Sequence, residues 1–290
     1  MPKLTFYTHP MSRGRTVRWM LEECGATYET VPLEYGSTMK APEYLAINPM
    51  GKVPAIRHND TVITETAAIC AYLADLLPLR QLAPSTNNPE RGSYYRWLFF
   101  AAGVVEPAVV AKSMGLLAPE DKRLVAGYGS FDDVMRVLEM TTAQAVKQGG
   151  YLCARHFTAA DLYLASQLDW GMRFGTIDKR QAFADYIGPL LQRPAKQTAD
   201  ALDDALLTQM PQKEEKPGGP GHKTTPLVPA ATPARTFTAV NRQTRCTVRI
   251  RPTRNEPHTG CPAAKLETVA PPSPAHLAAY RQAPPRFSAS

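Results

Sequence analysis

The chain has 290 residues and a formal net charge of +7, and this charge is unevenly distributed. Residues 1–212 hold 21 Lys and Arg against 22 Asp and Glu, whereas residues 213–290 hold 12 against 4. The basic balance therefore belongs to the C-terminal segment and gives no reason to expect a specific nucleic-acid partner. No run reaches the ~20 apolar residues of a membrane helix, and a strand pattern begins at Leu4, so we expect neither a membrane span nor a signal peptide.

Residues 1–80 predict an α/β domain, because strand and helix patterns alternate along them. The strands are expected at residues 4–8, 28–33, 53–57 and 62–63, the last two as an antiparallel pair around the turn at 58–61. The helices are expected at residues 13–24, 44–45 and 67–77. Ser12 stands directly before the first long helix, where its hydroxyl either caps the helix or meets a bound anion.

The segment from Asn48 to Ile56 contains a turn that enters a short apolar run through Val53-Pro54. Proline has no backbone donor, and X-Pro is the peptide bond whose cis form costs least. We therefore expect a cis Pro54 that leaves the N–H and C=O of Val53 available to an extended peptide. Lys52, just before it, is either a partner for a carboxylate or simply exposed.

Glu65 and Thr66 stand just before the apolar run of the next helix. The first amides of a helix are unpaired and lie at the positive end of its dipole. Thr66 and these amides would therefore form a small anion site beside the Glu65 carboxylate. A strand-like edge next to such a site suits a short peptide acid.

Residues 89–210 predict an all-helical domain, and residues 81–88 predict the linker, within a stretch marked by proline and asparagine. One long helix is expected to begin at Pro89, and a second to run from about residue 120 to residue 148 with an interruption at 127–129. Thr158 and Asp161 have the spacing of a capping box at the start of a buried helix. Their role is structural rather than catalytic.

Residues 211–290 predict a disordered, basic tail. Residues 213–290 hold 13 of the 27 prolines and few large aliphatic residues, so they cannot bury enough surface to offset chain ordering. The tail is either a genuine extension that contacts acidic partners or translated sequence without a selected function. Cys246, His258 and Cys261 are one ligand short of a zinc site, so we expect no metal.

Together these motifs resemble the cytosolic glutathione S-transferase family, in its bacterial type with a serine-type active-site turn. The matching segments are Leu4–Tyr7 for the first strand, Ser12–Arg15 for the active-site turn, Asn48–Ile56 for the cis-proline loop, and Glu65-Thr66 for the γ-glutamyl position. The resemblance implies a thioredoxin-like N-terminal domain followed by an all-α domain, and a homodimer. It also implies that glutathione is a co-substrate and that no further cofactor is needed.

The resemblance further implies that the turn at Ser12 holds glutathione as its thiolate. A free thiol has a pKa near ~8.5, so the site must stabilise the anion, and a hydroxyl donor at a helix start does so. Tyr7, at the end of the first strand, is the alternative donor, as in some branches of the family. Arg13 and Arg15 either add positive field near the sulfur or are solvated.

The remaining groups of glutathione have candidate partners by the same resemblance. Val53 would pair with the cysteinyl backbone beside Pro54, Glu65 and Thr66 would hold the γ-glutamyl ammonium and carboxylate, and Lys52 would meet the glycyl carboxylate. A small electrophilic substrate is expected between the turn at Pro10-Met11 and the first long helix. Its candidate contacts are Tyr95, Phe99 and Phe100, unless these aromatic side chains belong to the helical core.

The sequence thus predicts a glutathione transferase that directs a thiolate at a soft electrophilic carbon, as in detoxification. The five cysteines include no C-x-x-C pair, and Cys24, Cys70 and Cys153 lie among apolar neighbours, which favours a reducing, cytoplasmic setting. Two alternatives stay open. One is a non-catalytic interaction module with the same fold, and the other is a glutathione-dependent isomerase, dehalogenase or peroxidase.

Overall fold

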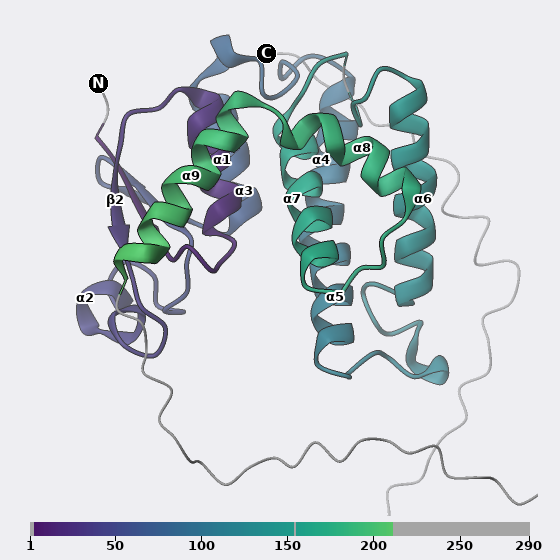
Figure 1. Ribbon diagram of the computed structural model, residues 1–290, viewed down its shortest axis with the longest axis horizontal. Coiled ribbons are helices and arrows are strands. Elements are labelled where there is room, and N and C mark those ends of the chain that lie inside the picture. The colour runs from purple at the N-terminus through teal and green to yellow at the C-terminus, as the bar shows by residue number, and fades with distance from the viewer. Residues whose placement is uncertain (1–2, 154, 211–290) are drawn as a thin grey trace, which may run out of the picture. The chain divides into compact units, whose positions relative to one another are not determined.

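Residues 3–153 and 155–210 are described by the computed structural model (Figure 1). All of them fall within Met1–Pro217, the first of two units into which the chain divides. The predicted tail at residues 211–290, with Cys246, His258 and Cys261, lies outside the described residues. Its predicted disorder therefore stays a prediction.

The N-terminal part of the described chain is an α/β unit built on a four-stranded sheet of order β2-β1-β3-β4. Its elements are β1 (Leu4–Thr8), α1 (Gly14–Cys24), β2 (Tyr28–Pro32), α2 (Pro42–Leu45), β3 (Ala55–His58), β4 (Thr61–Thr64) and α3 (Thr66–Leu76). Strand β2 runs parallel to β1, whereas β3 and β4 are antiparallel to their neighbours. This is the predicted thioredoxin-like arrangement, which is thereby confirmed.

Burial explains why β1 and α1 lie next to each other at the centre of this unit. All five residues of β1 are buried, and Val17, Met20 and Leu21 of α1 belong to the same hydrophobic core cluster as Leu4 and Phe6 of β1. Gly25 ends α1 in the left-handed conformation, with φ of 61°, where a side chain is disfavoured. At the other end of α1, the chain leaves β1 at Thr8 and turns before α1 begins at Gly14.

The rest of the described chain is helical, as predicted. Its elements are α4 (Glu90–Phe100), a π-helical segment (Ala101–Val105), α5 (Glu106–Ser113), α6 (Phe131–Lys147), α7 (Ala159–Arg173), α8 (Gln181–Leu191) and α9 (Pro194–Gln209). Helix α7 contacts α1, α3 and α4, and α9 returns to pack on α1 (Figure 1). Pro107 lies in the first turn of α5, and the π-helical segment before it accommodates its missing N–H.

The helix predicted from about residue 120 to 148 is wrong in its first third. Residues Glu120–Lys122 form one 3-10 turn, and α6 begins at Phe131. Gly129 has φ of 68°, and the Ser130 side chain accepts the Asp133 amide as an N-cap. The helix therefore starts anew at this N-cap, because Gly127 and Gly129 disfavour a helix that continues from residue 120.

The capping box at the start of α7 is confirmed. Thr158 and Asp161 exchange their hydrogen bonds as the pattern predicts, and both side chains are fully buried. Among the helices of residues 3–153 and 155–210, none has the length and apolar character to cross a membrane. In the same residues, no cluster of His, Cys, Asp and Glu is arranged to hold a metal ion.

Candidate active site

The turn between β1 and α1 carries Ser12, whose side chain is 7% exposed. The Ser12 hydroxyl donates to the His9 carbonyl at 2.6 Å and accepts the Gly14 amide at 2.9 Å. A Cβ on Gly14 would lie 1.9 Å from the Thr8 Oγ1, so the turn requires glycine there. Ser12, one residue before the N-cap Arg13, therefore accepts the first amide of α1, and its hydroxyl hydrogen already has an acceptor within the turn.

His9 stabilises the same turn through its ring. The Met11 amide donates to His9 Nδ1 at 3.0 Å, which requires an unprotonated Nδ1. Burial lowers the His9 pKa, and the nearby Glu34 carboxylate only partly opposes this. The His9 ring also packs on Tyr35, with centroids 4.5 Å apart.

The loop before β3 presents an open peptide edge at Val53. The Val53-Pro54 bond is cis, as predicted. The Tyr44 hydroxyl and the Asn48 side-chain amide both donate to the Lys52 carbonyl, at 2.6 and 2.8 Å, and so turn that carbonyl inward. Within the described part of the chain, the N–H and C=O of Val53 have no hydrogen-bond partner.

The start of α3 provides a second polar wall. Glu65 has φ of 65°, an uncommon value for a residue other than glycine, and it directly precedes the buried Thr66. The first backbone bond of this helix runs from the Ile69 amide to the Glu65 carbonyl at 2.9 Å. The amides before Ile69 are therefore open at the positive end of the helix dipole.

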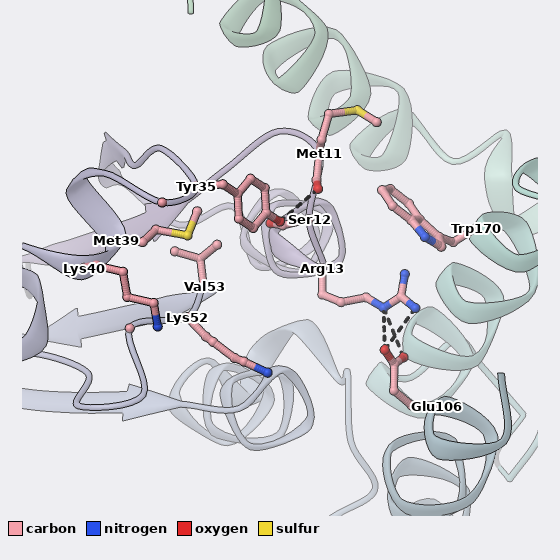
Figure 2. A pocket seen from close by; sticks show the side chains of 12 residues that line it. Met11, Ser12, Arg13, Tyr35, Met39, Lys40, Lys52, Val53, Glu106 and Trp170 are labelled. Carbon is pink, nitrogen blue, oxygen red and sulfur yellow. Dashed lines mark hydrogen bonds and ion pairs between the residues drawn. The ribbon is translucent and has the colours of Figure 1, made fainter. Parts of the chain in front are cut away.

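Two adjoining cavities bring these segments together. One measures about 440 Å³ and the other about 420 Å³, and Arg13, Lys52, Val53 and Glu106 line both. Figure 2 shows the first of them. The first cavity also reaches Ser12, and the second reaches Pro54, Glu65 and Thr66. The structure thus places six of the seven predicted site residues around one continuous region.

Tyr7, the seventh, lies elsewhere. Its side chain is 7% exposed and belongs to a small apolar cluster with Leu33, Met39, Tyr44 and Ala55. Its ring packs against Tyr44 at a centroid distance of 5.7 Å, and it lines neither cavity.

An ion pair between the two parts of the described chain lines both cavities. The Arg13 guanidinium meets the Glu106 carboxylate of α5 through contacts of 3.0 to 3.1 Å, and its Cζ lies 5.2 Å from the centre of the Trp170 ring (Figure 2). Gln167 of α7 also donates to Glu106. Arg13, Glu106 and Trp170 therefore come from three elements and meet beside Ser12.

The charges around the cavities favour an anionic ligand. Arg13, Lys40 and Lys52 line the first cavity, and the Lys52 ammonium points into it without an ion-pair partner among the described residues (Figure 2). Lys40 donates to the Met50 carbonyl at 2.8 Å. The carboxylates Glu65 and Glu106 limit the excess, so a ligand with both an ammonium and carboxylates fits.

Comparison with known proteins decides the family. The sequence matches the family model described as Glutathione S-transferase, N-terminal domain, over residues 2–75. It is 31% identical to a probable glutathione S-transferase of Oryza sativa subsp. japonica over 164 residues, covering 51% of this chain and 74% of that protein. It is also 30% identical to the glutathione S-transferase GstA of Escherichia coli over 159 residues, covering 54% of this chain and 76% of that protein. The chain belongs to the glutathione S-transferase family.

Solved structures of glutathione S-transferases resemble this family member throughout their length. A glutathione transferase from Methylococcus capsulatus has a TM-score of 0.58 at 26% identity, covering 70% of this chain and 99% of that one. A sphingomonad glutathione S-transferase complexed with glutathione has a TM-score of 0.57 at 27% identity, covering 69% of this chain and 98% of that one.

Sequence reasoning placed the turn at Pro10-Met11 beside the electrophile, but it missed Tyr35 and Trp170 in the cavity of this glutathione S-transferase. Met11, Tyr35 and Trp170 form the apolar wall of the first cavity, and Tyr35 donates to the Met11 carbonyl at 3.1 Å. Burial raises the pKa of the Tyr35 hydroxyl, and its hydrogen bond to Ser12 opposes this rise. Position 35 has no motif around it, and position 170 faces the turn only because α7 packs on α1.

The aromatic side chains expected at the electrophile position lie elsewhere. Tyr95, Phe99 and Phe100 line neither cavity. Tyr95 and Phe99 stack at 6.0 Å, with Phe99 62% exposed, and Phe100 packs edge-on against Trp97. Helical spacing placed them on α4, but it did not determine which face of α4 turns toward the N-terminal part.

Proposed function

We propose that the protein is a glutathione transferase that binds glutathione along Val53 and activates its thiol at Ser12. The observation that carries this proposal is the open Val53 peptide beside cis Pro54, flanked by Ser12 on one side and by Glu65-Thr66 on the other. An extended tripeptide that pairs with Val53 would have its glycyl carboxylate near Lys52 and its γ-glutamyl ammonium near Glu65. Its thiol is then directed toward the turn.

Each polar group of glutathione has a proposed partner in the cavities. The γ-glutamyl carboxylate would accept from the open amides at the start of α3 and from Thr66, while Glu65 pairs with the ammonium. The glycyl carboxylate would approach Lys52. The cysteinyl N–H and C=O would complete the hydrogen bonds of Val53 as one added strand residue.

Ser12 is the proposed donor to the sulfur. Its hydroxyl now donates to the His9 carbonyl at 2.6 Å, and rotation about the Cβ–Oγ bond would redirect that hydrogen to a thiolate. The charge-assisted bond to sulfur is stronger than the neutral bond that it replaces, so the exchange favours the anion. Each unit by which the thiol pKa falls corresponds to about 1.4 kcal/mol of preferential stabilisation.

The proposed reaction is nucleophilic substitution or addition at an electrophilic carbon. The thiol proton passes to solvent when glutathione ionises, and the thiolate then forms a C–S bond. In substitution the leaving group departs with the electron pair of the broken bond, and in addition the resulting carbanion takes a proton from solvent. The chain's contribution is to hold the sulfur ionised and close to the electrophile. Met11, Tyr35 and Trp170 offer apolar surface for that substrate. We propose detoxification as the role, with glutathione as co-substrate and no additional cofactor.

The domain division, assembly and location belong to the same proposal. A first domain at residues 1–80, a linker at 81–88 and a helical domain at 89–210 agree with the end of α3 at Leu76 and the start of α4 at Glu90. A homodimer is supported by the exposed Tyr95–Phe99 pair on α4. Buried thiols at Cys24 and Cys70, whose pKa values burial raises, support a reducing cytoplasm.

Turnover of chlorodinitrobenzene with glutathione tests the function. We expect the Ser12→Ala variant to lose roughly ten- to a hundredfold in kcat/KM, equivalent to about 1.4–2.7 kcal/mol, while it still binds immobilised glutathione. Tyr7→Phe is the matched control and should retain activity. An inactive wild-type chain, or equal activity in Ser12→Ala, would overturn the proposed role.

A further inference from the structure

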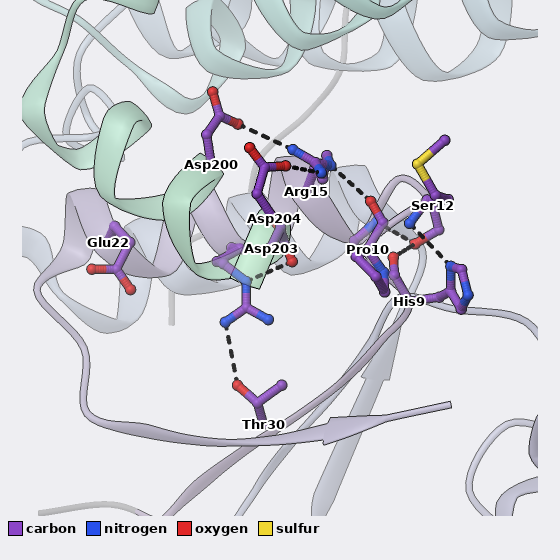
Figure 3. Close-up of polar contacts among 12 residues, drawn as sticks. His9, Pro10, Ser12, Arg15, Glu22, Thr30, Asp200, Asp203 and Asp204 are labelled. Atoms are coloured by element: carbon purple, nitrogen blue, oxygen red, sulfur yellow. Dashed lines mark hydrogen bonds and ion pairs between the residues drawn. The ribbon is translucent and has the colours of Figure 1, made fainter. Parts of the chain in front are cut away.

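Arg15 links the C-terminal helix α9 to the turn that carries Ser12. Its Nε donates to the Pro10 carbonyl at 2.7 Å. Its terminal nitrogens meet Asp204 at 2.5 Å and Asp200 at 3.6 Å, both on α9 (Figure 3). The Arg15 side chain is 16% exposed, so these contacts are formed largely out of water.

The Pro10 carbonyl is the acceptor through which Arg15 holds this turn. Pro10 has no N–H, so its carbonyl is the one backbone group through which a hydrogen bond can hold this residue. The neighbouring His9 carbonyl accepts the Ser12 hydroxyl, and the Met11 amide donates to the His9 ring. Side chains, rather than regular secondary structure, therefore hold consecutive peptide groups from residue 9 to residue 12.

Arg15 does not face the sulfur position directly. Each of its three guanidinium nitrogens already has an oxygen partner. Arg15 lines a small cavity of about 30 Å³ on the α9 side of Ser12 and Arg13, and it lines neither of the two larger cavities. Its positive charge is balanced by the two α9 carboxylates. Any effect of Arg15 on glutathione must therefore pass through the position of the turn.

Other ion pairs join the same helices without contact to the turn. Arg18 meets Asp203 at 2.8 Å in the buried interface, and Arg193, the N-cap of α9, meets Glu23 at 2.6 Å at the far end of α1. Several ion pairs thus hold α9 against α1. Arg15 differs from them because it also bonds to the Pro10 carbonyl.

We propose that Arg15, held by Asp204, is a positioning residue that fixes the Pro10 carbonyl and thereby sets Ser12 at the distance from which it can donate to the thiolate. This inference rests on the proposed function for its chemical consequence. Its structural content, a turn held by α9 through Arg15, is independent of any activity.

Two readouts on the full chain test the inference. The first is amide hydrogen exchange of the turn at residues 9–14, which requires no turnover. The second is the pH dependence of kcat/KM for glutathione with chlorodinitrobenzene. The variants are Arg15→Ala, Arg15→Lys and Asp204→Asn, with Arg193→Ala as the control that removes a neighbouring α1–α9 ion pair.

In Arg15→Ala we expect at least tenfold faster exchange in the turn. We also expect the pH midpoint to rise by about one unit, which corresponds to a loss of kcat/KM that approaches tenfold at pH values below both midpoints. Asp204→Asn should produce a smaller shift in the same direction. Arg15→Lys keeps the charge but cannot bond to Pro10 and both carboxylates at once. Compared with Arg15→Ala, it should recover most of the free energy of unfolding but little of the shift in the pH midpoint. Arg193→Ala should lower stability and leave both readouts unchanged.

The outcomes separate the two claims. Unchanged exchange in Arg15→Ala, or equal changes in Arg193→Ala, would show that α9 docking alone matters and would overturn the inference. Faster exchange in Arg15→Ala with no pH shift, in a chain whose Ser12→Ala variant is impaired, would also overturn it. Faster exchange in a chain without any turnover would support the turn-holding role and refute the proposed function.

Discussion

At the scale of single residues, the turn from His9 to Arg15 depends on side chains that hold its peptide groups. Ser12 is predicted from sequence because a hydroxyl before a helix either caps it or meets an anion, and the structure shows this hydroxyl accepting the first amide of α1. Gly14 is equally constrained, since a Cβ there would lie 1.9 Å from Thr8 Oγ1. The turn has therefore little freedom to accept substitutions.

A pH effect on stability is expected from His9. Burial lowers its pKa below 6.5, so the unfolded chain binds the proton more tightly than the folded chain. The stability contributed by the neutral ring is present above pH 6.5 and is lost as the pH falls from there through the lowered pKa. The His9→Gln variant accepts the Met11 amide without titrating, so its urea midpoint should fall less than that of wild type between pH 7.5 and pH 5. Equal losses in the two proteins would contradict this assignment.

At the scale of elements, the start of α7 is the best-defined feature. Asp161 accepts from the Thr158 amide and hydroxyl, the Leu152 amide and the Tyr186 hydroxyl, at 2.8 to 2.9 Å. Burial raises the pKa of this carboxyl, and these hydrogen bonds oppose that rise. The capping pattern was readable in the sequence because its two residues are three apart. The bonds from Leu152 and Tyr186 were not, since they depend on the packing of α7 and α8.

Replacement of Asp161 tests that view of α7. We expect Asp161→Ala to lower the free energy of unfolding by about 3 kcal/mol, because several buried donors lose their acceptor at once. Asp161→Asn keeps one acceptor oxygen and should cost less. Urea denaturation measures both. A loss below about 1 kcal/mol for the alanine variant would mean that water replaces the carboxylate.

At the scale of the whole molecule, the cavities exist because the helical part packs against the N-terminal part. Glu106 of α5 and Trp170 of α7 are brought to Arg13 by that packing, and they lie more than ninety positions along the chain from the turn. The Arg13–Glu106 contact is therefore the direct polar link across the cavities.

A double-mutant cycle measures that link. Arg13 and Glu106 have side chains 22% and 27% exposed, so solvent screens the pair partly and its coupling should be about 1 kcal/mol. Arg13→Ala, Glu106→Gln and the double variant, unfolded in urea, give the coupling free energy. Strict additivity would show that the Arg13–Glu106 pair does not help to hold the two parts together.

The sequence by itself determined the elements of the N-terminal α/β part, their order, the cis Pro54 loop and the residues at the starts of α1 and α3, because each depends on neighbours within a few positions. It also supported two hydroxyl donors, Ser12 at the turn and Tyr7 as the alternative at the end of the first strand. Only the tertiary structure decided between their locations: Ser12 faces the cavity, whereas Tyr7 is enclosed by Tyr44 and Met39. The apolar wall of Met11, Tyr35 and Trp170 and the Arg15–Asp204 link were likewise decided by tertiary structure, since they join residues as distant as α1 and α9 whose contact depends on how all the intervening helices pack.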